Sequence, residues 1–374
     1  MTPILFFIFG CNQEGTKIID TDIVNEENEA VDTGNTEASD TNEVDTEDTE
    51  DTNETNDTDT DDTNDTNDTE DTGEIIVPPE KIRFVALGDG GEGNETQYAV
   101  ADAMLEVCTN KTTTDLEGCE FALYLGDNFY DVGVDSVYDS QFDDKFELPY
   151  QNIDFPFYVV LGNHDAGGWG SGFELYKTEH QVDYTNHSAK WTMPNEYYAF
   201  EHGHASFFGL DTNALMWDPL LNSGSAQESW IGPAITQALG DWKIAFGHHP
   251  YISNGQHGNA GSYEGIDFID WAIADVPLGV AVEDFMNTHI CGNIDVYFSG
   301  HDHNRQWLEP ACGTEFIVTG AAAKTTDLQN RGNPTLFEDD QIAGFFWVEI
   351  EGNCLTGEFY DQNSQLQFSH QFCK

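Results

Sequence analysis

Five short apolar segments of this chain share one pattern: each is followed at once, or after one residue, by glycine, and then by aspartate, asparagine or histidine. Their lengths and their bounding glycines are typical of buried central strands. The segments are residues 82–87, 121–125, 157–161, 242–246 and 294–298. In open α/β sheets, sites form beyond the carboxyl ends of the strands, where glycine lets the backbone turn sharply. The pattern therefore predicts an α/β fold in which five loops bring polar side chains to one rim.

The rest of the chain from Lys81 onward agrees with this fold class. Residues 95–107 have a helical pattern, and the sequence from Phe316 to the end indicates further strands and hairpins, which we expect to complete a second sheet. This part of the chain, roughly 290 residues, can bury a full hydrophobic core. We therefore assign residues 81–374 to one folded domain, with Pro78 and Pro79 at its boundary.

Residues 12–80 consist mainly of aspartate, threonine, glutamate and asparagine. This composition offers almost no apolar surface to offset the entropy of an ordered chain, so it predicts a disordered acidic linker that repels itself. A calcium-binding loop is the alternative, because Asp-x-Asp spacings occur. The glycine and the terminal glutamate of an EF-hand loop are absent, which favours the linker.

Residues 1–11 form an apolar run that is too short to span a bilayer and fits the apolar stretch of an export signal. Its end, Ile8–Cys11 (IFGC), resembles a bacterial lipobox, in which the cysteine is lipidated. The alternative is a truncated start with an ordinary cysteine. We expect an exported protein, either a cell-surface or periplasmic lipoprotein or a secreted one, with contact to a membrane only through a lipid on Cys11.

Seven cysteines are present, and setting Cys11 aside leaves six, an even number that indicates disulfides in an exported protein. Spacing alone does not fix the pairing, although neighbours in sequence are plausible partners. For Cys354 and Cys373 there is a geometric argument. A two-residue turn at Asn363 and Ser364 would place these two cysteines opposite each other on an antiparallel hairpin. Reduced, buried cysteines are the alternative.

The formal net charge of the chain is −58, from 70 acidic and 12 basic residues. Nucleic acids and anionic lipids are bound through lysine and arginine, so this balance argues against both as partners. We interpret the acidity as a solvated surface.

The residues that follow the five strands offer oxygen and nitrogen donors and no thiolate. This set of donors suits iron, zinc or manganese rather than a structural zinc cluster. A carboxylate shared by two cations can hold them about 4 Å apart. At this separation the two cations can stabilise both the attacking and the leaving oxygen of a phosphoryl transfer.

At these residues the chain resembles the calcineurin-like metallophosphoesterase superfamily, and within it the purple (tartrate-resistant) acid phosphatases. The motifs are Gly88–Gly91 (GDGG), Gly126–Tyr130 (GDNFY), Gly162–Asp165 (GNHD), Gly247–Pro250 (GHHP) and Gly300–His303 (GHDH). Tyr130, three residues after Asp127, and Gly91, where many phosphodiesterases carry histidine, are similar to the purple branch. The resemblance covers about Lys81 to Gly320 and implies a four-layer α-β-β-α sandwich.

The resemblance also implies a role for each residue of the site. In the family the first ion is ferric iron, and the second is divalent iron, zinc or manganese. Seven residues would bind the two ions: Asp89, Tyr130 and His303 the first, Asn163, His248 and His301 the second, and Asp127 both, as the bridge. His164 and His257 would be the catalytic residues beside the phosphate. Alternatives exist: the aspartates as turn residues, and Tyr130 as core packing. We interpret His249 as packing or support behind the ligands, and Asp165 as orienting a histidine or the loop.

The reaction implied is hydrolysis of a phosphomonoester, on a small molecule or a phosphoprotein, by hydroxide formed at the two cations. A phosphodiesterase or a nucleotide-pyrophosphate hydrolase could use the same site. A non-catalytic, surface-displayed binding protein is the alternative from another class, and it would be expected to lack one of these residues.

Overall fold

The computed structural model describes residues 81–264 and 279–374 of the 374-residue chain. The export signal, the lipobox at Cys11 and the acidic linker all fall on residues 1–80, outside the described residues. These remain predictions.

The described chain forms two seven-stranded sheets. The first has the order β14-β13-β12-β1-β2-β3-β4, and its strands are β1 (Lys81–Leu87), β2 (Phe121–Tyr124), β3 (Phe157–Val159), β4 (Trp191–Thr192), β12 (Gly344–Glu351), β13 (Cys354–Asp361) and β14 (Leu366–Cys373). The second has the order β11-β9-β10-β8-β7-β6-β5, with β5 (Tyr198–His202), β6 (Ala205–Gly209), β7 (Trp242–Phe246), β8 (Val296–Ser299), β9 (Arg305–Leu308), β10 (Glu315–Thr319) and β11 (Thr335–Asp339).

The centre of each sheet is parallel. In the first sheet β1, β2 and β3 pair in parallel, and in the second sheet β6, β7, β8 and β10 do the same. All five apolar segments singled out in the sequence are strands of these parallel regions, so the prediction of central strands is confirmed. Parallel neighbours end at the same edge of a sheet, which brings the polar residues after them together.

The end of the chain differs from the prediction. Only β10 and β11 complete the second sheet, whereas β12, β13 and β14 extend the first, because β12 pairs antiparallel with β1 over Lys81–Ala86. A strand's apolar pattern shows that it has a buried face but not which distant edge it joins, and this pairing links residues more than 250 positions apart.

The inner faces of the two sheets pack through aromatic rings. Phe84 of β1 stacks on Phe121 of β2 at 5.0 Å between ring centroids. Across the interface Phe84 meets Phe207 of β6 edge-on at 5.5 Å and Phe298 of β8 at 5.9 Å. All four rings are buried, and such pairs contribute about 0.5–1.5 kcal/mol each beyond their area burial. This core holds the two sets of strand ends together.

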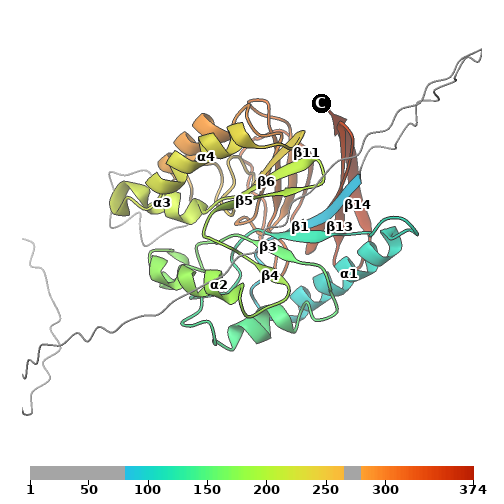
Figure 1. The fold of residues 1–374 in the computed structure, drawn as a ribbon, viewed down its shortest axis with the longest axis horizontal. Helices are drawn as coiled ribbons and strands as arrows, with labels where there is room; N and C mark the ends of the chain where they lie inside the picture. Colours follow the sequence, from blue (N-terminus) through green and yellow to red (C-terminus); the bar gives the residue numbers. More distant parts are fainter. Residues whose placement is uncertain (1–80, 265–278) are drawn as a thin grey trace, which may run out of the picture. The chain divides into compact units, whose positions relative to one another are not determined.

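Helices cover the outer faces. α1 (Glu95–Lys111), capped by Asn94, whose side chain accepts from the Gln97 N–H, packs on the first sheet near β12 and β13. A separate core joins the second sheet to α3 (Thr212–Leu221), α4 (Ser225–Gln237) and α6 (Val280–Phe285). Figure 1 shows α3 and α4 on the side of β5 and β6 that faces away from the first sheet. The predicted order of helix, sheet, sheet and helix is confirmed.

The other helical segments of residues 81–264 and 279–374 are short. They are α2 (Thr178–Tyr184), π-helical turns at Asp143–Glu147 and Met286–Ile290, and 3₁₀ turns at Gly168–Gly170 and Leu175–Lys177. Within the described ranges, no helix has the length and apolarity to cross a membrane.

Three disulfides join neighbouring cysteines: Cys108–Cys119, Cys291–Cys312 and Cys354–Cys373. Such bonds form and persist in oxidising compartments, in line with the predicted export. Cys354 and Cys373 pair directly on the β13–β14 hairpin, as predicted. The turn is longer than two residues, and a bulge between Phe359 and Tyr360 restores the register. Asp361 holds the turn by accepting from the Asn363 and Gln365 N–H groups.

We expect the Cys354→Ser, Cys373→Ser double variant to lose about 3 kcal/mol of unfolding free energy, because the unfolded chain regains the entropy of the closed loop. Denaturant unfolding measures the loss, and hydrogen exchange should show the β13–β14 hairpin opening first. Free thiols at both positions in the exported wild-type protein, or unchanged stability in the variant, would contradict the bond.

Candidate metal centre

The turns after the strands bring backbone and ligand atoms unusually close. Asp89, Asp127 and His301 adopt positive φ angles of 60°, 52° and 68° immediately after a strand-end glycine. A Cβ on Gly162 would lie 2.3 Å from Asp127 N and Oδ1, and a Cβ on Gly300 would lie 2.5 Å from Asp89 Oδ2. Only glycine fits at these two positions, so the motif glycines are required by the approach of one loop to another.

Asp165 accepts hydrogen bonds from the loops that follow β2 and β3. Its buried carboxylate accepts from Gly162 N (2.7 Å), Asn128 N (2.9 Å) and Phe129 N (3.1 Å). The structure thus supports a loop-orienting role for Asp165. Burial and the charge of Asp127 raise the pKa of this carboxyl to about 7, against the bonds from these N–H groups.

The first group of predicted ligands comprises Asp89, Tyr130 and His303. The Tyr130 hydroxyl donates to Asp89 Oδ1 at 3.0 Å and lies 3.1 Å from His303 Nε2, which is itself 3.5 Å from Asp89 Oδ1. The three residues come from the ends of β1, β2 and β8, so this group joins both sheets.

The second group comprises Asn163, His248 and His301. His248 Nε2 lies 2.9 Å from Asn163 Oδ1 and 3.1 Å from His301 Nδ1. Asp127 lies between the two groups: its Oδ1 is 3.5 Å from His248 Nε2, and its ligand atoms lie within 4.8 Å of those of Asp89 and His303. The structure therefore brings the other six predicted ligands together around Asp127.

The protonation pattern of the second group fits a cation. His248 Nδ1 lies 2.9 Å from the Leu125 carbonyl oxygen, which only accepts, so Nδ1 carries the proton and Nε2 of the neutral ring is a lone pair. Asn163 Nδ2 donates to Gly170 O, so the amide oxygen is the atom that faces His248. Two acceptors at 2.9 Å repel each other unless a cation lies between them. The residues present thus fit a bound metal.

The pKa values of the first group follow from burial. Burial raises the pKa of Asp89 to about 7. His248 lowers this pKa, and the charge of Asp127 raises it further. Burial would also raise the pKa of Asp127, but the nearby His248 and His164 outweigh it and hold that pKa below its ordinary value. Burial, with Lys324 nearby, lowers the pKa of His303 to about 4, so this imidazole is neutral at neutral pH. Burial and the two carboxylates raise the pKa of Tyr130 well above its ordinary value, so its phenol ionises only when a cation compensates.

Each of the two predicted catalytic histidines has its Nδ1 beside a backbone carbonyl oxygen. His164 Nδ1 lies 2.9 Å from Asp131 O and His257 Nδ1 lies 2.8 Å from Glu264 O, so in each neutral ring Nδ1 donates and Nε2 is left free. Asp302 accepts from the His257 backbone N–H at 2.7 Å. Both histidines line a pocket of about 830 Å³ together with Asp127.

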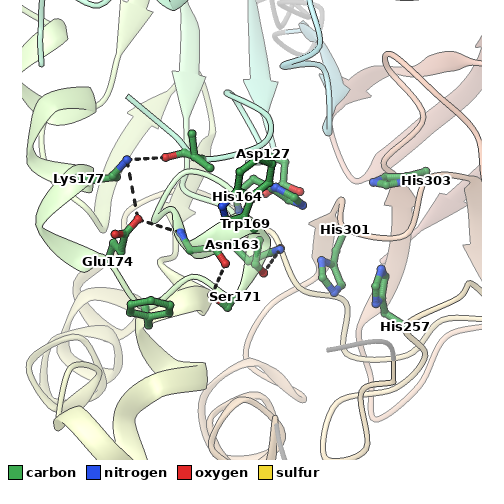
Figure 2. Close-up of a pocket in the computed structure, with 14 residues that line it drawn as sticks. Asp127, Asn163, His164, Trp169, Ser171, Glu174, Lys177, His257, His301 and His303 are labelled. Carbon is green, nitrogen blue, oxygen red and sulfur yellow. Dashed lines mark hydrogen bonds and ion pairs between the residues drawn. The ribbon is translucent and has the colours of Figure 1, made fainter. Parts of the chain in front are cut away.

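Figure 2 shows how this pocket is arranged: His257, His301 and His303 lie on one side, Glu174 and Lys177 lie on the opposite side, and Asp127, Asn163 and His164 lie between them. Lys177 is not free to meet a ligand, because its Nζ donates to Val132 O and pairs with Asp135 at 2.8 Å each.

Sequence reasoning missed Lys324 and Trp169, and it described His249 only as packing or support behind the ligands. His249 is buried with the ligand group of His248 and His301, and its Nδ1 meets Thr212 Oγ1 at 2.9 Å. Lys324 lies 3.4 Å from the centre of the Tyr130 ring and pairs with Glu92 at 2.6 Å. Trp169 lines the pocket. The Gly-His-His-Pro run was a signal for His249, whereas no local pattern marks Lys324.

Comparison with known proteins agrees with this geometry. The family model "Calcineurin-like phosphoesterase" matches residues 82–305. The chain is 25% identical over 316 residues to tartrate-resistant acid phosphatase type 5 of Homo sapiens, covering 77% of this chain and 89% of the relative. It is 26% identical over 262 residues to purple acid phosphatase 7 of Arabidopsis thaliana, covering 65% and 70% of the two chains. The chain therefore belongs to the calcineurin-like phosphoesterase family, and it is a metal-dependent phosphoester hydrolase.

Two solved structures share the fold. The purple acid phosphatase PPD1 of yellow lupin (Lupinus luteus) seeds superimposes with a TM-score of 0.56 at 15% identity, covering 79% of this chain and 54% of that one. GAP50, the anchor in the inner membrane complex of Plasmodium, superimposes with a TM-score of 0.59 at 21% identity, covering 78% and 89%. These likenesses confirm the predicted fold class.

We expect uptake of Zn²⁺ by the metal-free protein to release about one more proton from the wild type than from Asp89→Asn at pH 5.5. With a pKa of about 7, Asp89 is protonated at that pH and must ionise to bind a cation. Affinity should therefore rise with pH up to about 7. Titration calorimetry in buffers of different ionisation enthalpy counts the protons. Equal release from the two proteins at pH 5.5, or no difference between pH 5.5 and pH 8, would contradict this assignment.

Proposed function

We propose that this protein is a phosphomonoesterase of the acid phosphatase type, with a two-metal centre held by Asp89, Tyr130 and His303 on one side of Asp127 and by Asn163, His248 and His301 on the other. The main support is that hydrogen-bond acceptors, among them His248 Nε2 and Asn163 Oδ1, lie close together near Asp127. Beside them lie His164 and His257, whose Nε2 atoms are free. Fe(III) with Fe(II), Zn(II) or Mn(II) suits this set of oxygen and nitrogen donors.

Two cations bound there would neutralise a phosphate and make a water nucleophilic at modest pH. Asp127 would hold the pair together. His164, fixed by its bond to Asp131 O, and His257, fixed by its bond to Glu264 O, would meet the phosphate oxygens or protonate the leaving group. The buried position of Asp127 and His301 strengthens these electrostatic interactions, because little water screens them.

A steric detail favours the purple type of site over the phosphodiesterase type. A Cβ on Gly91 would lie 2.2 Å from the Asn128 carbonyl carbon and oxygen and 2.5 Å from Phe129 N. No histidine can stand at position 91 without moving the loop that carries Asp127. Instead, Tyr130 supplies its hydroxyl oxygen as a candidate metal ligand beside Asp89 and His303, and this oxygen is 3.0 Å from Asp89 Oδ1.

Two other functions remain as alternatives. A phosphodiesterase or a nucleotide-pyrophosphate hydrolase would use the same ligands and differ in substrate. A non-catalytic binding protein would resemble GAP50, which serves as an anchor and has a similar fold. Four of the predicted ligands, Asp127, Asn163, His301 and His303, line one pocket with both histidines, and the other three contact ligands of the same site, which supports a catalytic site here.

We expect the metal-loaded wild type to hydrolyse phosphomonoesters faster than diesters or pyrophosphates. Asp127→Asn should lower kcat/KM by about 10³-fold or more, because the shared carboxylate supplies several kcal/mol of transition-state stabilisation through the metals. Metal content, measured on the same samples, should fall with it. Asp102→Asn, at an exposed carboxylate of α1, is the control and should change neither quantity. Full metal content and full activity in Asp127→Asn would exclude the bridge.

A second test concerns Tyr130. A phenolate bound to ferric iron absorbs visible light by charge transfer, so the iron-loaded protein should be coloured, and Tyr130→Phe should lose the band while keeping its fold. Tyr124→Phe, at a buried tyrosine of β2, is the matched control and should keep the colour. Colourless wild-type protein with stoichiometric iron would place Tyr130 outside the ligand set.

A further inference from the structure

The loop of residues 167–174 forms the pocket wall opposite the metal-binding histidines. Gly168, Trp169, Gly170, Ser171, Phe173 and Glu174 all line the pocket. Trp169 is 79% exposed and Phe173 is 45% exposed, both high for large apolar side chains. A pocket of about 830 Å³ is far larger than a phosphate group needs and falls in the range of sites that hold whole small molecules.

The backbone at Trp169 is held in an uncommon conformation. Its φ and ψ of 56° and 41° lie in the left-handed region, which bulky residues rarely occupy, and its neighbours Gly167, Gly168 and Gly170 also have positive φ. Such strain persists only where surrounding contacts impose it, and it gathers at ligand-binding sites.

Those contacts are present on both sides of the loop. Glu174 Oε2 accepts from Gly168 N at 2.9 Å. From α3, Trp217 Nε1 donates to Ser171 O at 3.0 Å and Asn213 Nδ2 donates to Gly172 O at 2.9 Å. The loop is therefore ordered before any ligand arrives, so little entropy is lost when a ligand packs against it.

The same loop touches the centre of the site. Gly170 O accepts from Asn163 Nδ2 at 2.7 Å, and a Cβ on Gly170 would lie 2.6 Å from the His164 ring. Trp169 is one residue away, about 3.8 Å along the chain. An indole at this position can reach a group attached to a phosphate that lies between His164 and the metals.

Among the residues that the structure describes, this wall offers aromatic surface and no unpaired lysine or arginine. Lys177 is the lysine among the described lining residues, and its Nζ donates to Val132 O, pairs with Asp135 and lies near Glu174. This combination favours a flat, uncharged ring over a second phosphate group, because ring faces stack on aromatic side chains whereas further phosphates need cations.

We propose that Trp169 is a specificity-determining residue, a stacking platform that selects phosphomonoesters whose leaving group carries a planar ring, such as an aryl phosphate or a nucleoside monophosphate. This inference rests on the proposed phosphomonoesterase function and names its substrate class.

The test compares kcat/KM for phenyl phosphate and adenosine 5′-monophosphate with that for glycerol 2-phosphate, which has no ring. In Trp169→Ala the ratio of ring-bearing to ring-free substrate should fall about tenfold, or about 1.4 kcal/mol. Trp169→Phe should keep most of the preference. Tyr138→Ala, at a side chain that is 82% exposed and lies outside the pocket lining, should leave the ratio unchanged. If kcat/KM falls for phenyl phosphate alone, Trp169 favours substrates whose ring is bonded directly to the ester oxygen. If it falls for the nucleotide alone, Trp169 favours substrates whose ring is carried on a sugar.

A binding measurement separates failure of this inference from failure of the proposed function. Phenylphosphonate and methylphosphonate are not hydrolysed as esters, and calorimetry gives their affinities for the metal-loaded protein. The phenyl compound should bind about tenfold more tightly to the wild type and lose that advantage in Trp169→Ala. If the wild type hydrolyses no monoester, the proposed function fails while this comparison still decides the role of Trp169. Equal affinities in the wild type, or an advantage that survives in Trp169→Ala, would overturn the platform.

Discussion

The site depends on Asp127, a buried carboxylate just after β2 that lies between two groups of candidate ligands, each of which takes residues from both sheets. An isolated charge at such a depth is costly unless other charges and donors compensate it. The His164 backbone N–H, which donates to Asp127 Oδ1 at 2.9 Å, compensates part of this charge, and bound cations would compensate the rest. The parallel strand ends, the aromatic core between the sheets and the close contact at Gly162 all serve to keep this carboxylate where two cations could share it.

Much of this arrangement could be predicted because its signals are local. A short apolar run, a glycine and a donor residue identify a strand and the loop after it, and parallel strands bring such loops to one edge. Gly91 is an example. The sequence showed only that histidine is absent there, and the structure supplies the reason, which is the Asn128 carbonyl 2.2 Å from where a Cβ would stand.

What escaped prediction depends on distant contacts. The pairing of β12 with β1 decides which sheet receives the last three strands, and no local pattern encodes it. The orientation of His249 is set by Thr212 at the start of α3, and the charge beside Tyr130 comes from Lys324 in a loop far along the chain. Trp169 belongs to a glycine-rich loop without periodicity, so its place in the pocket follows only from the bonds made by α3 and Glu174. The candidate metal ligands could therefore be proposed from the sequence, whereas the pocket wall that would select a substrate could not.

Anomalous diffraction from crystals of the domain loaded with manganese or zinc is the sharpest test of whether two cations share Asp127, since it locates each ion independently of any assumed ligand. We expect two peaks about 3.5–4 Å apart, one beside Asp89, Tyr130 and His303 and one beside Asn163, His248 and His301, with Asp127 contacting both. A single ion at full occupancy under excess metal, or two ions that do not share Asp127, would contradict it.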